Sequence, residues 1–190
     1  MKSINIEETH RVSKLETAQN LKQYLLILRH YFAYQQAIER SKTKGTFLDI
    51  GSGYGSALHI ISNYYDNIIA IDVSQKALNS LPEISNMEKR LENATNLNIK
   101  NESVDIAVAF QIIEHVSYEN AKKIIREMHR VLKPGGIGFI TTPNARWRLL
   151  RHQKPWNPYH KKEYRPNEIK KFCKDLNINK IKLLGVKGLN

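Results

Sequence analysis

The sequence contains only one cysteine, Cys173, among its 190 residues. A single cysteine excludes an internal disulfide and any zinc site built from several cysteines, and we expect no metal site. Long hydrophobic runs are also lacking, since no stretch approaches the roughly 20 apolar residues of a membrane-spanning helix. Residues 1–8 do not form the apolar segment of a secretory signal peptide. We therefore expect a cytoplasmic protein.

Acidic residues are scarce, with 18 Asp and Glu against 30 Lys and Arg, which gives a net charge of +12. The surplus is concentrated near the C-terminus, where residues 145–190 hold 13 Lys or Arg and three acids. Two explanations account equally well for this bias. The basic residues form a solvated face, or they contact a phosphorylated substrate, a nucleic acid or a membrane surface. Charge alone does not choose among these.

The most informative stretch reads Phe47-Leu48-Asp49-Ile50-Gly51-Ser52-Gly53-Tyr54-Gly55. An apolar run with an acid, three alternating glycines and then an amphipathic segment are typical of a strand, a tight loop and a helix. Glycine lacks Cβ, so the loop backbone can take positive φ and approach a ligand closely. The helix would begin with unpaired N–H groups that face the same ligand. The sequence therefore predicts a binding site at this loop.

The rest of the hydrophobic pattern alternates between strands and helices. A long helical pattern covers 12–42; we expect its aromatic residues mostly to pack, with one or two lining a pocket. Strands are predicted at 46–50, 67–72, 88–94, 104–110, 137–142 and 178–186, and helices from the glycine loop to 63, over 74–85, over 119–132 and from 166 to 176. This alternation predicts an α/β fold: a Rossmann-like, doubly wound, mostly parallel sheet with helices on both faces, preceded by an N-terminal helical segment.

A second acid supports a nucleoside ligand. Asp72 ends the second predicted strand and lies 21 positions after Gly51. An acid at that place can accept hydrogen bonds from both ribose hydroxyls, which suits NAD as well as other adenosine ligands. Because ligands bind at the carboxyl ends of parallel strands, we expect the glycine loop, Asp72, Ala94 and Gln111 to converge on one crevice.

Four motifs are similar to those of class I S-adenosylmethionine-dependent methyltransferases of the type 11 subgroup. The first is 49–55, in which an acid stands two residues before the first glycine; the dinucleotide fingerprint has no such acid. The others follow in the order and spacing of the family and read Glu114-His115-Val116, Arg130-Val131-Leu132-Lys133-Pro134-Gly135-Gly136 and Thr141-Thr142-Pro143-Asn144. The resemblance covers roughly 46–176. Within the subgroup, 54–58, 142–144 and 157–160 look like a set associated with the modification of sugars and cell-surface polysaccharides.

The resemblance implies the roles of individual residues. The three glycines would approach the methionine part of the cofactor, S-adenosylmethionine, while Asp49 would hold the loop and contact the amino end. Asp72 would bind the ribose hydroxyls, with Val73 against the adenine ring. Asn93 stands where the family usually has Asp and would accept from the adenine amino group. The expected cofactor-binding residues are Asp49, Gly51, Ser52, Gly53, Tyr54, Gly55, Asp72, Val73, Asn93, Ala94 and Gln111, the last near the methionine carboxylate or the transferring methyl.

Catalysis by such a protein needs alignment of the acceptor with the methyl group more than covalent help. A hydroxyl acceptor would benefit from a general base, and His115 and His160 are the candidate catalytic residues. The alternatives are that His115 packs or caps the turn after the fourth strand and that His160 is a surface loop residue. Glu114 is expected to orient the loop.

Under this interpretation 1–190 is one methyltransferase domain. It would comprise an N-terminal helical cap (1–45), a cofactor-binding core (46–144) and a basic substrate-side loop, helix and last strand (145–190). The family's sheet usually carries a further antiparallel strand beside the fifth, so the protein is minimal, takes the strand from elsewhere, or is truncated after Asn190. The lid expected to cover the acceptor is short, since only the N-terminal helix and the loop over 144–165 would form it.

The expected function is methyl transfer to a small-molecule acceptor, either a saccharide or an anionic conjugate. An RNA methyltransferase that uses the basic C-terminal region and a non-catalytic cofactor-binding domain are the alternatives. Methylation of base amino groups is disfavoured because Gln111-Ile112-Ile113-Glu114 replaces the Pro-Pro-aromatic motif of those enzymes. Cys173 is expected in the core rather than as a nucleophile. An NAD-dependent oxidoreductase is disfavoured by Asp49.

Overall fold

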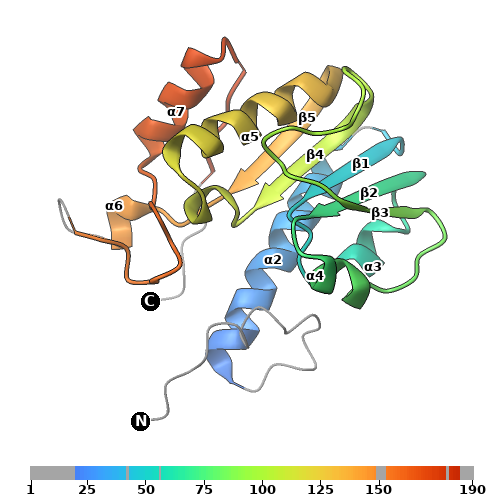
Figure 1. Ribbon diagram of the computed structural model, residues 1–190, viewed down its shortest axis with the longest axis horizontal. Helices are drawn as coiled ribbons and strands as arrows, with labels where there is room; N and C mark the ends of the chain where they lie inside the picture. The colour runs from blue at the N-terminus through green and yellow to red at the C-terminus, as the bar shows by residue number, and fades with distance from the viewer. Residues whose placement is uncertain (1–19, 42, 56, 149–152, 179, 185–190) are drawn as a thin grey trace.

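Five parallel strands form one sheet at the centre of the computed structural model, which describes residues 20–41, 43–55, 57–148, 153–178 and 180–184 (Figure 1). The strands are β1 (Thr46–Ile50), β2 (Asn67–Asp72), β3 (Met87–Leu91), β4 (Val104–Phe110) and β5 (Leu132–Thr141). Their order in the sheet is β3-β2-β1-β4-β5, and every pair is parallel. The order reverses between β1 and β4, so the ligand crevice is expected beyond the carboxyl ends of these two strands.

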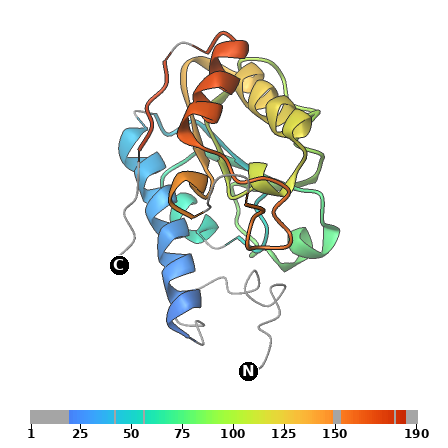
Figure 2. The ribbon, with the colours of Figure 1, turned by 90° about the vertical axis from the view of Figure 1, so that its left-hand side faces the viewer.

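Helices cover both faces of the sheet, as predicted (Figures 1 and 2). One face carries α2 (Leu21–Arg40), α3 (Leu58–Ile61) and α4 (Gln75–Ser80), and the other carries α5 (Tyr118–Val131) with α7 (Pro166–Asp175) beside it. A single turn, η2 (Ile113–His115), follows β4, and α6 (Ala145–Arg148) follows β5. None of the described helices is long and apolar enough to cross a bilayer.

The two-residue period of the strands divides the core between the faces. In β1, Phe47 packs with α2 and α3, whereas Leu48 and Ile50 face the other way, toward α5. Each such fully buried side chain contributes on the order of 1.5–3 kcal/mol of hydrophobic stabilisation. The same alternation directs Asp49 toward the α2 side, where it is buried. A carboxyl group is thereby placed inside the apolar layer, directly before the glycine loop.

The predicted bounds of β1, β2 and β4 are confirmed, while other elements differ in length. Helix α4 ends at Ser80 instead of 85, because Pro82 forces Leu81 into an extended conformation. Strand β5 begins at Leu132 rather than at 137: the Lys133–Gly136 segment does end α5, but it continues in extended form with a register shift opposite Val104 and Ile106. The part of the first predicted helix before residue 20 lies outside the described residues.

The last predicted strand, 178–186, is not formed over its described residues, 178 and 180–184. Asn177 takes a positive φ of 58°, and the N–H of Ile178 bonds to the carbonyl of Cys173, which ends α7. Ile181, Leu183 and Leu184 then lie exposed. Their apolar character suggested a strand, but residues 178 and 180–184 do not pair with the edge of the sheet.

Candidate functional site

The three glycines of the loop after β1 all have positive φ: 71° at Gly51, 51° at Gly53 and 69° at Gly55. Two of them are needed for packing, because a Cβ at Gly51 would overlap Ile112 Cδ1 and one at Gly55 would come within 2.6 Å of Leu81 Cδ2. Around Gly53 nothing described lies within 4 Å of the corresponding position. The loop is therefore packed against the protein at its ends and open in the middle.

Asp72 closes the loop from the end of β2. Its Oδ2 accepts a hydrogen bond from the Gly53 N–H at 2.9 Å, and its Oδ1 accepts one from the Ser74 N–H at 2.8 Å. The N–H groups of Gly51 and Ser52 bond to the Ile71 carbonyl. An ionised carboxylate has about four acceptor positions, so Asp72 keeps capacity for hydroxyl donors. The structure thus brings this acid and the glycines together, as the spacing predicted.

Asp49 lies beneath the loop and is bonded to α2. The Tyr34 hydroxyl donates to Asp49 Oδ2 at 2.8 Å, and both residues are buried. The pKa of Asp49 is raised to about 7: burial raises it most, the Tyr34 hydrogen bond partly opposes that rise, and the negative charge of Asp72 adds to it. The pKa of Tyr34 is itself raised by burial and by Asp49. A cation arriving at the loop would favour the ionised form of Asp49.

Tyr34 was not singled out by the sequence analysis, which assigned the aromatic residues of this helix mostly to packing. Its ring does pack, edge-on against Phe110 with centroids 4.8 Å apart. The available signal was its place on the same helical face as Ile27 and Ala37, which are both buried. A hydroxyl on that face needs an acceptor, and Asp49 is the acid that strand alternation directs there.

The side of the crevice expected for adenine has an exposed apolar residue and an exposed amide. Val73 is 71% exposed directly after Asp72. Asn93 Oδ1 already accepts from the Thr95 N–H and hydroxyl, at 3.0 and 2.9 Å. A hydrogen bond from an adenine amino group to Asn93 Oδ1 would therefore compete with these two bonds. The Nδ2 group of Asn93 can still donate. Ala94 is half-buried beside it.

Gln111 ties the ends of β4 and β5 together. Its N–H bonds to the Thr141 carbonyl at 2.9 Å, and its Nε2 donates to Thr141 Oγ1 at 3.1 Å. Its φ is 58°, a left-handed conformation that costs a non-glycine residue about 1–2 kcal/mol. Such strain persists only where the surroundings fix it, and it is concentrated at functional sites.

The two candidate histidines, 45 positions apart in the chain, are in contact. The rings of His115 and His160 lie edge to face with centroids 4.8 Å apart. His160 Nδ1 lies 2.9 Å from Glu163 Oε1, and His115 Nδ1 lies 3.2 Å from the Tyr159 carbonyl oxygen. The side chain of His160 is 7% exposed, so the interpretation of it as a surface residue is wrong.

Glu114 joins this pair and holds the loop, as predicted. Its side chain is fully buried, and Oε2 accepts from the Thr142 hydroxyl at 3.0 Å. Its carbonyl accepts from the N–H groups of Lys161 and Lys162, which fixes the segment that carries His160 against η2. The proximity of Glu114 and Glu163 to His160 could not be predicted from the sequence, because it depends on how the segment after α6 folds back.

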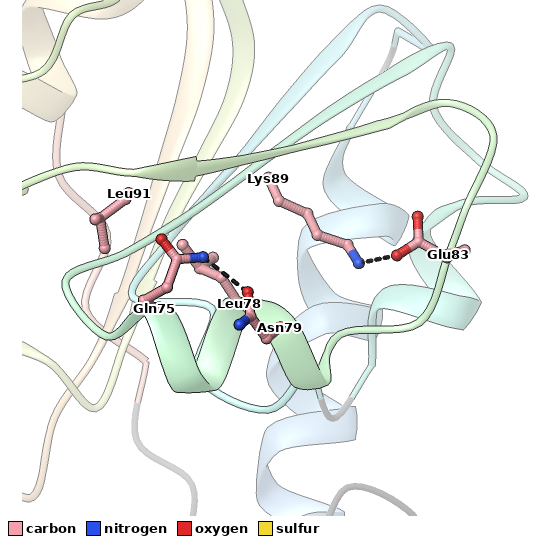
Figure 3. A pocket seen from close by; sticks show the side chains of 6 residues that line it. All are labelled: Gln75, Leu78, Asn79, Glu83, Lys89 and Leu91. Carbon is pink, nitrogen blue, oxygen red and sulfur yellow. Dashed lines mark hydrogen bonds and ion pairs between the residues drawn. The ribbon is translucent and has the colours of Figure 1, made fainter.

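Figure 3 shows a pocket between α4 and β3. Its polar side chains pair with one another: Lys89 with Glu83, and Gln75 with Asn79 at 2.8 Å. It contains no predicted site residue, and its lining offers no converging polar groups to a ligand. Cys173 is buried, as expected of a core residue.

Comparisons with known proteins agree with this geometry. Residues 48–140 match the family described as a methyltransferase domain. Probable S-adenosylmethionine-dependent methyltransferases of Mycolicibacterium smegmatis and Mycobacterium tuberculosis are each 28% identical over 83% of this chain, covering 61% and 57% of their own lengths. The chain thus spans about three fifths of the length of these curated relatives. The solved structure of the small RNA methyltransferase HEN1 superposes with a TM-score of 0.67 and 22% identity, over 84% of this chain and 22% of that one. Through residues 48–140, the chain belongs to the class I S-adenosylmethionine-dependent methyltransferases of type 11.

Proposed function

We propose that this protein transfers the methyl group of S-adenosylmethionine to a small-molecule acceptor, a saccharide or an anionic conjugate. The observation that carries the proposal is the cradle at the carboxyl ends of β1 and β2. There, Gly53 borders open space, Asp72 holds the loop, and the buried carboxyl of Asp49 lies beneath it. In this cradle Ser52 Oγ is buried without a hydrogen-bond partner among the described residues, which suits a polar ligand.

The cradle offers a matching group to each part of the cofactor. Asp72 would accept from the ribose hydroxyls, and Val73 would lie against the adenine ring. Asp49, ionised in response to positive charge, would attract the amino end of the methionine. Gln111, held in its strained conformation, would position the carboxylate or the methyl-bearing end. The cofactor supplies the electrophilic sulfonium methyl, and the chain supplies alignment.

His115 and His160 are the side chains that we propose to meet the acceptor. His115 ends η2, four residues after Gln111, and the ring of His160 contacts it. The acceptor oxygen would form its bond to the methyl carbon as the carbon–sulfur bond breaks, and its proton would pass to this cluster or to solvent. Exposed lysines of the same segment, among them Lys154 and Lys161, favour an anionic acceptor.

An RNA acceptor is the second candidate, and one observation favours it. Trp156 and Tyr159 are 67% and 53% exposed within the basic segment 153–165, and exposed aromatic rings among cations suit stacking on unpaired bases. RNA binding of this kind would weaken steeply as salt increases. Filter binding of single-stranded RNA across a salt series, with Trp156→Ala as the variant, separates this candidate from a small acceptor.

Calorimetric titration with S-adenosylhomocysteine tests the cofactor site. We expect micromolar binding that falls at least tenfold in Asp72→Ala, while Asp66→Ala, which alters an exposed acid before β2, leaves it unchanged. NAD is the competing ligand, and tight binding of NAD with none of S-adenosylhomocysteine would overturn the proposal. Transfer of a labelled methyl group to fractionated small molecules then identifies the acceptor.

A further inference from the structure

We propose that Glu114, His115 and His160 form a binding site for one divalent transition-metal cation. Each residue offers one ligand atom, and these atoms all lie within 4.8 Å of one another. Two imidazole nitrogens and a carboxylate oxygen are the three protein ligands found in open metal sites. This inference reverses the expectation from the sequence, which considered only cysteine ligands.

The hydrogen bonds of the two histidines orient them as ligands. The Tyr159 carbonyl can only accept, so Nδ1 of His115 donates to it, and Glu163 as a carboxylate accepts in the same way from Nδ1 of His160. Nε2 then carries the lone pair that a metal ion requires. A carboxylate or a backbone carbonyl at the far nitrogen is the usual support of a metal-bound histidine, because it fixes the tautomer and the ring orientation.

The rest of the cluster is held in place before any ion binds. Thr142 donates to Oε2 of Glu114 from the end of β5. The main-chain bonds from Lys161 and Lys162 to the Glu114 carbonyl, at 2.8 and 3.2 Å, anchor the segment of His160 to η2. Such preorganisation reduces the cost of ordering the ligands around an ion.

Charge favours a cation at this point. Glu114 and Glu163 are both buried beside the two imidazoles. Buried carboxylates are stabilised by a bound or paired cation, since their desolvation is costly. Mixed nitrogen and oxygen ligands suit Mn²⁺, Co²⁺ and Zn²⁺ better than Mg²⁺, which prefers oxygen alone.

The place of the cluster gives the ion a role in acceptor binding. Glu114 follows the strained Gln111 by three residues, and Ile112 between them packs against Gly51 of the cofactor loop. Three protein ligands leave coordination positions open to an acceptor hydroxyl, or to two adjacent ones. An ion there would lower the pKa of a hydroxyl that it contacts and orient it toward the methyl group. This role rests on the proposed function, whereas the binding of the ion does not.

Metal binding can be measured without catalysis. The full chain, free of any purification tag, is dialysed to equilibrium against Mn²⁺, Co²⁺, Zn²⁺ or Mg²⁺ alone, and retained metal is counted per chain. Visible absorption of the Co²⁺ form reports the nitrogen ligands. We expect one Co²⁺ or Mn²⁺ per chain, loss of that ion in His115→Ala and His160→Ala, and retention in His129→Ala, which changes an exposed histidine of α5.

A milder variant tests the metal site with less risk of misfolding. Glu163→Gln keeps the shape of the residue that supports His160, and we expect it to weaken metal affinity by about 10–100-fold. Failure of the parent protein to retain any of these ions at millimolar concentration would overturn the inference, as would equal retention by His160→Ala. Titration of the same preparation with S-adenosylhomocysteine separates the two proposals, because each ligand is measured alone.

Discussion

The two sides of the crevice are built in different ways. On the β1–β2 side, the acids and glycines come from one stretch, 49–72; main-chain N–H groups hold Asp72, and the Tyr34 hydroxyl of α2 holds Asp49. On the β4–β5 side, the cluster joins η2 to residues 160 and 163, and side-chain bonds orient its imidazoles. The residues of the first side are supplied by one short stretch, whereas the second side brings together residues from two distant segments. Backbone changes should therefore damage cofactor binding, and side-chain changes should damage acceptor binding.

The largest expected effect comes from Gly51→Ala, which tests the backbone side. The new Cβ would overlap Ile112, and the alanine would have to adopt a positive φ, so the loop must move. We expect a loss of about 2–3 kcal/mol in the free energy of unfolding and no measurable binding of S-adenosylhomocysteine. Chemical denaturation and calorimetry measure the two quantities.

Gly135→Ala is the matched control for that substitution. Gly135 also has a positive φ, 82°, but nothing described lies within 4 Å of its Cβ position. It should lose about 1 kcal/mol in stability and keep its affinity for the cofactor. Equal loss of cofactor affinity in both variants would mean that stability, and not the shape of the loop, limits binding.

Asp49→Asn is expected to weaken cofactor binding about 10–100-fold, as charge-assisted bonds are worth about 1.5–3 kcal/mol. Because the pKa of Asp49 is about 7 in the free protein, the parent should bind more tightly as pH rises from 6 to 8, when the carboxylate forms. The variant should show no such rise. A parent affinity that stays flat over this range would remove Asp49 from the cofactor site.

The same substitution makes a prediction about stability. The folded pKa of Asp49 lies above its ordinary value of 3.8, so its contribution to stability is fully present below that value and is lost as pH rises through about 7. Asp49→Asn, which does not ionise, should lack this loss. The variant should gain stability relative to the parent between pH 5 and pH 8, measured without cofactor.

Tyr34→Phe should have a smaller effect that depends on pH. It removes the hydroxyl that donates to Asp49 at 2.8 Å and leaves the ring packing in place. We expect a loss of about 1–3 kcal/mol at pH 8, where Asp49 is ionised, and less at pH 5.5, where it is protonated. Denaturation at the two pH values measures this; a loss that is larger at pH 5.5 would contradict the assigned titration of Asp49.

The smallest expected effect is that of Lys162→Gln on the acceptor side. Lys162 pairs with Glu168 at 2.7 Å and lies 5.3 Å from the Tyr118 ring centroid, with a partly exposed side chain. Exposed pairs contribute about 0.2–1 kcal/mol, so stability should fall by no more than that and cofactor affinity should not change. A fall in cofactor affinity would show that the two sides are coupled.

The contrast also explains what the sequence could predict. β1, β2 and β4 were predicted with their correct bounds, because apolar runs and the turns that follow them are local signals. The approach of Asp72 to the glycine loop was predicted from their places at the ends of two successive strands, although the hydrogen bond to Gly53 was not. The bond from Tyr34 to Asp49 and the approach of His160 to Glu114 depend on which faces pack together, and no local pattern contains that information.

The strand predicted at 178–186, which residues 178 and 180–184 do not form, failed for the same reason. Its alternating apolar residues satisfied the pattern of a strand, but pairing requires a free sheet edge in the right place. Asn177 instead turns the chain at the end of α7, in a conformation that asparagine tolerates well. A pattern of hydrophobicity thus predicted the residues that could pair without showing whether a partner strand was within reach.

The contact between Gly51 and Ile112 has a consequence for how the protein folds. The two residues are 61 positions apart, and β1 pairs with β4 across a similar separation, Phe47 with Ile106. Contacts between distant parts of a chain form slowly, since the intervening loop must first be closed. The glycine loop is complete only when β4 has docked and Ile112 fills the space beside Gly51. In refolding, recovery of ligand binding should therefore lag behind recovery of helical signal.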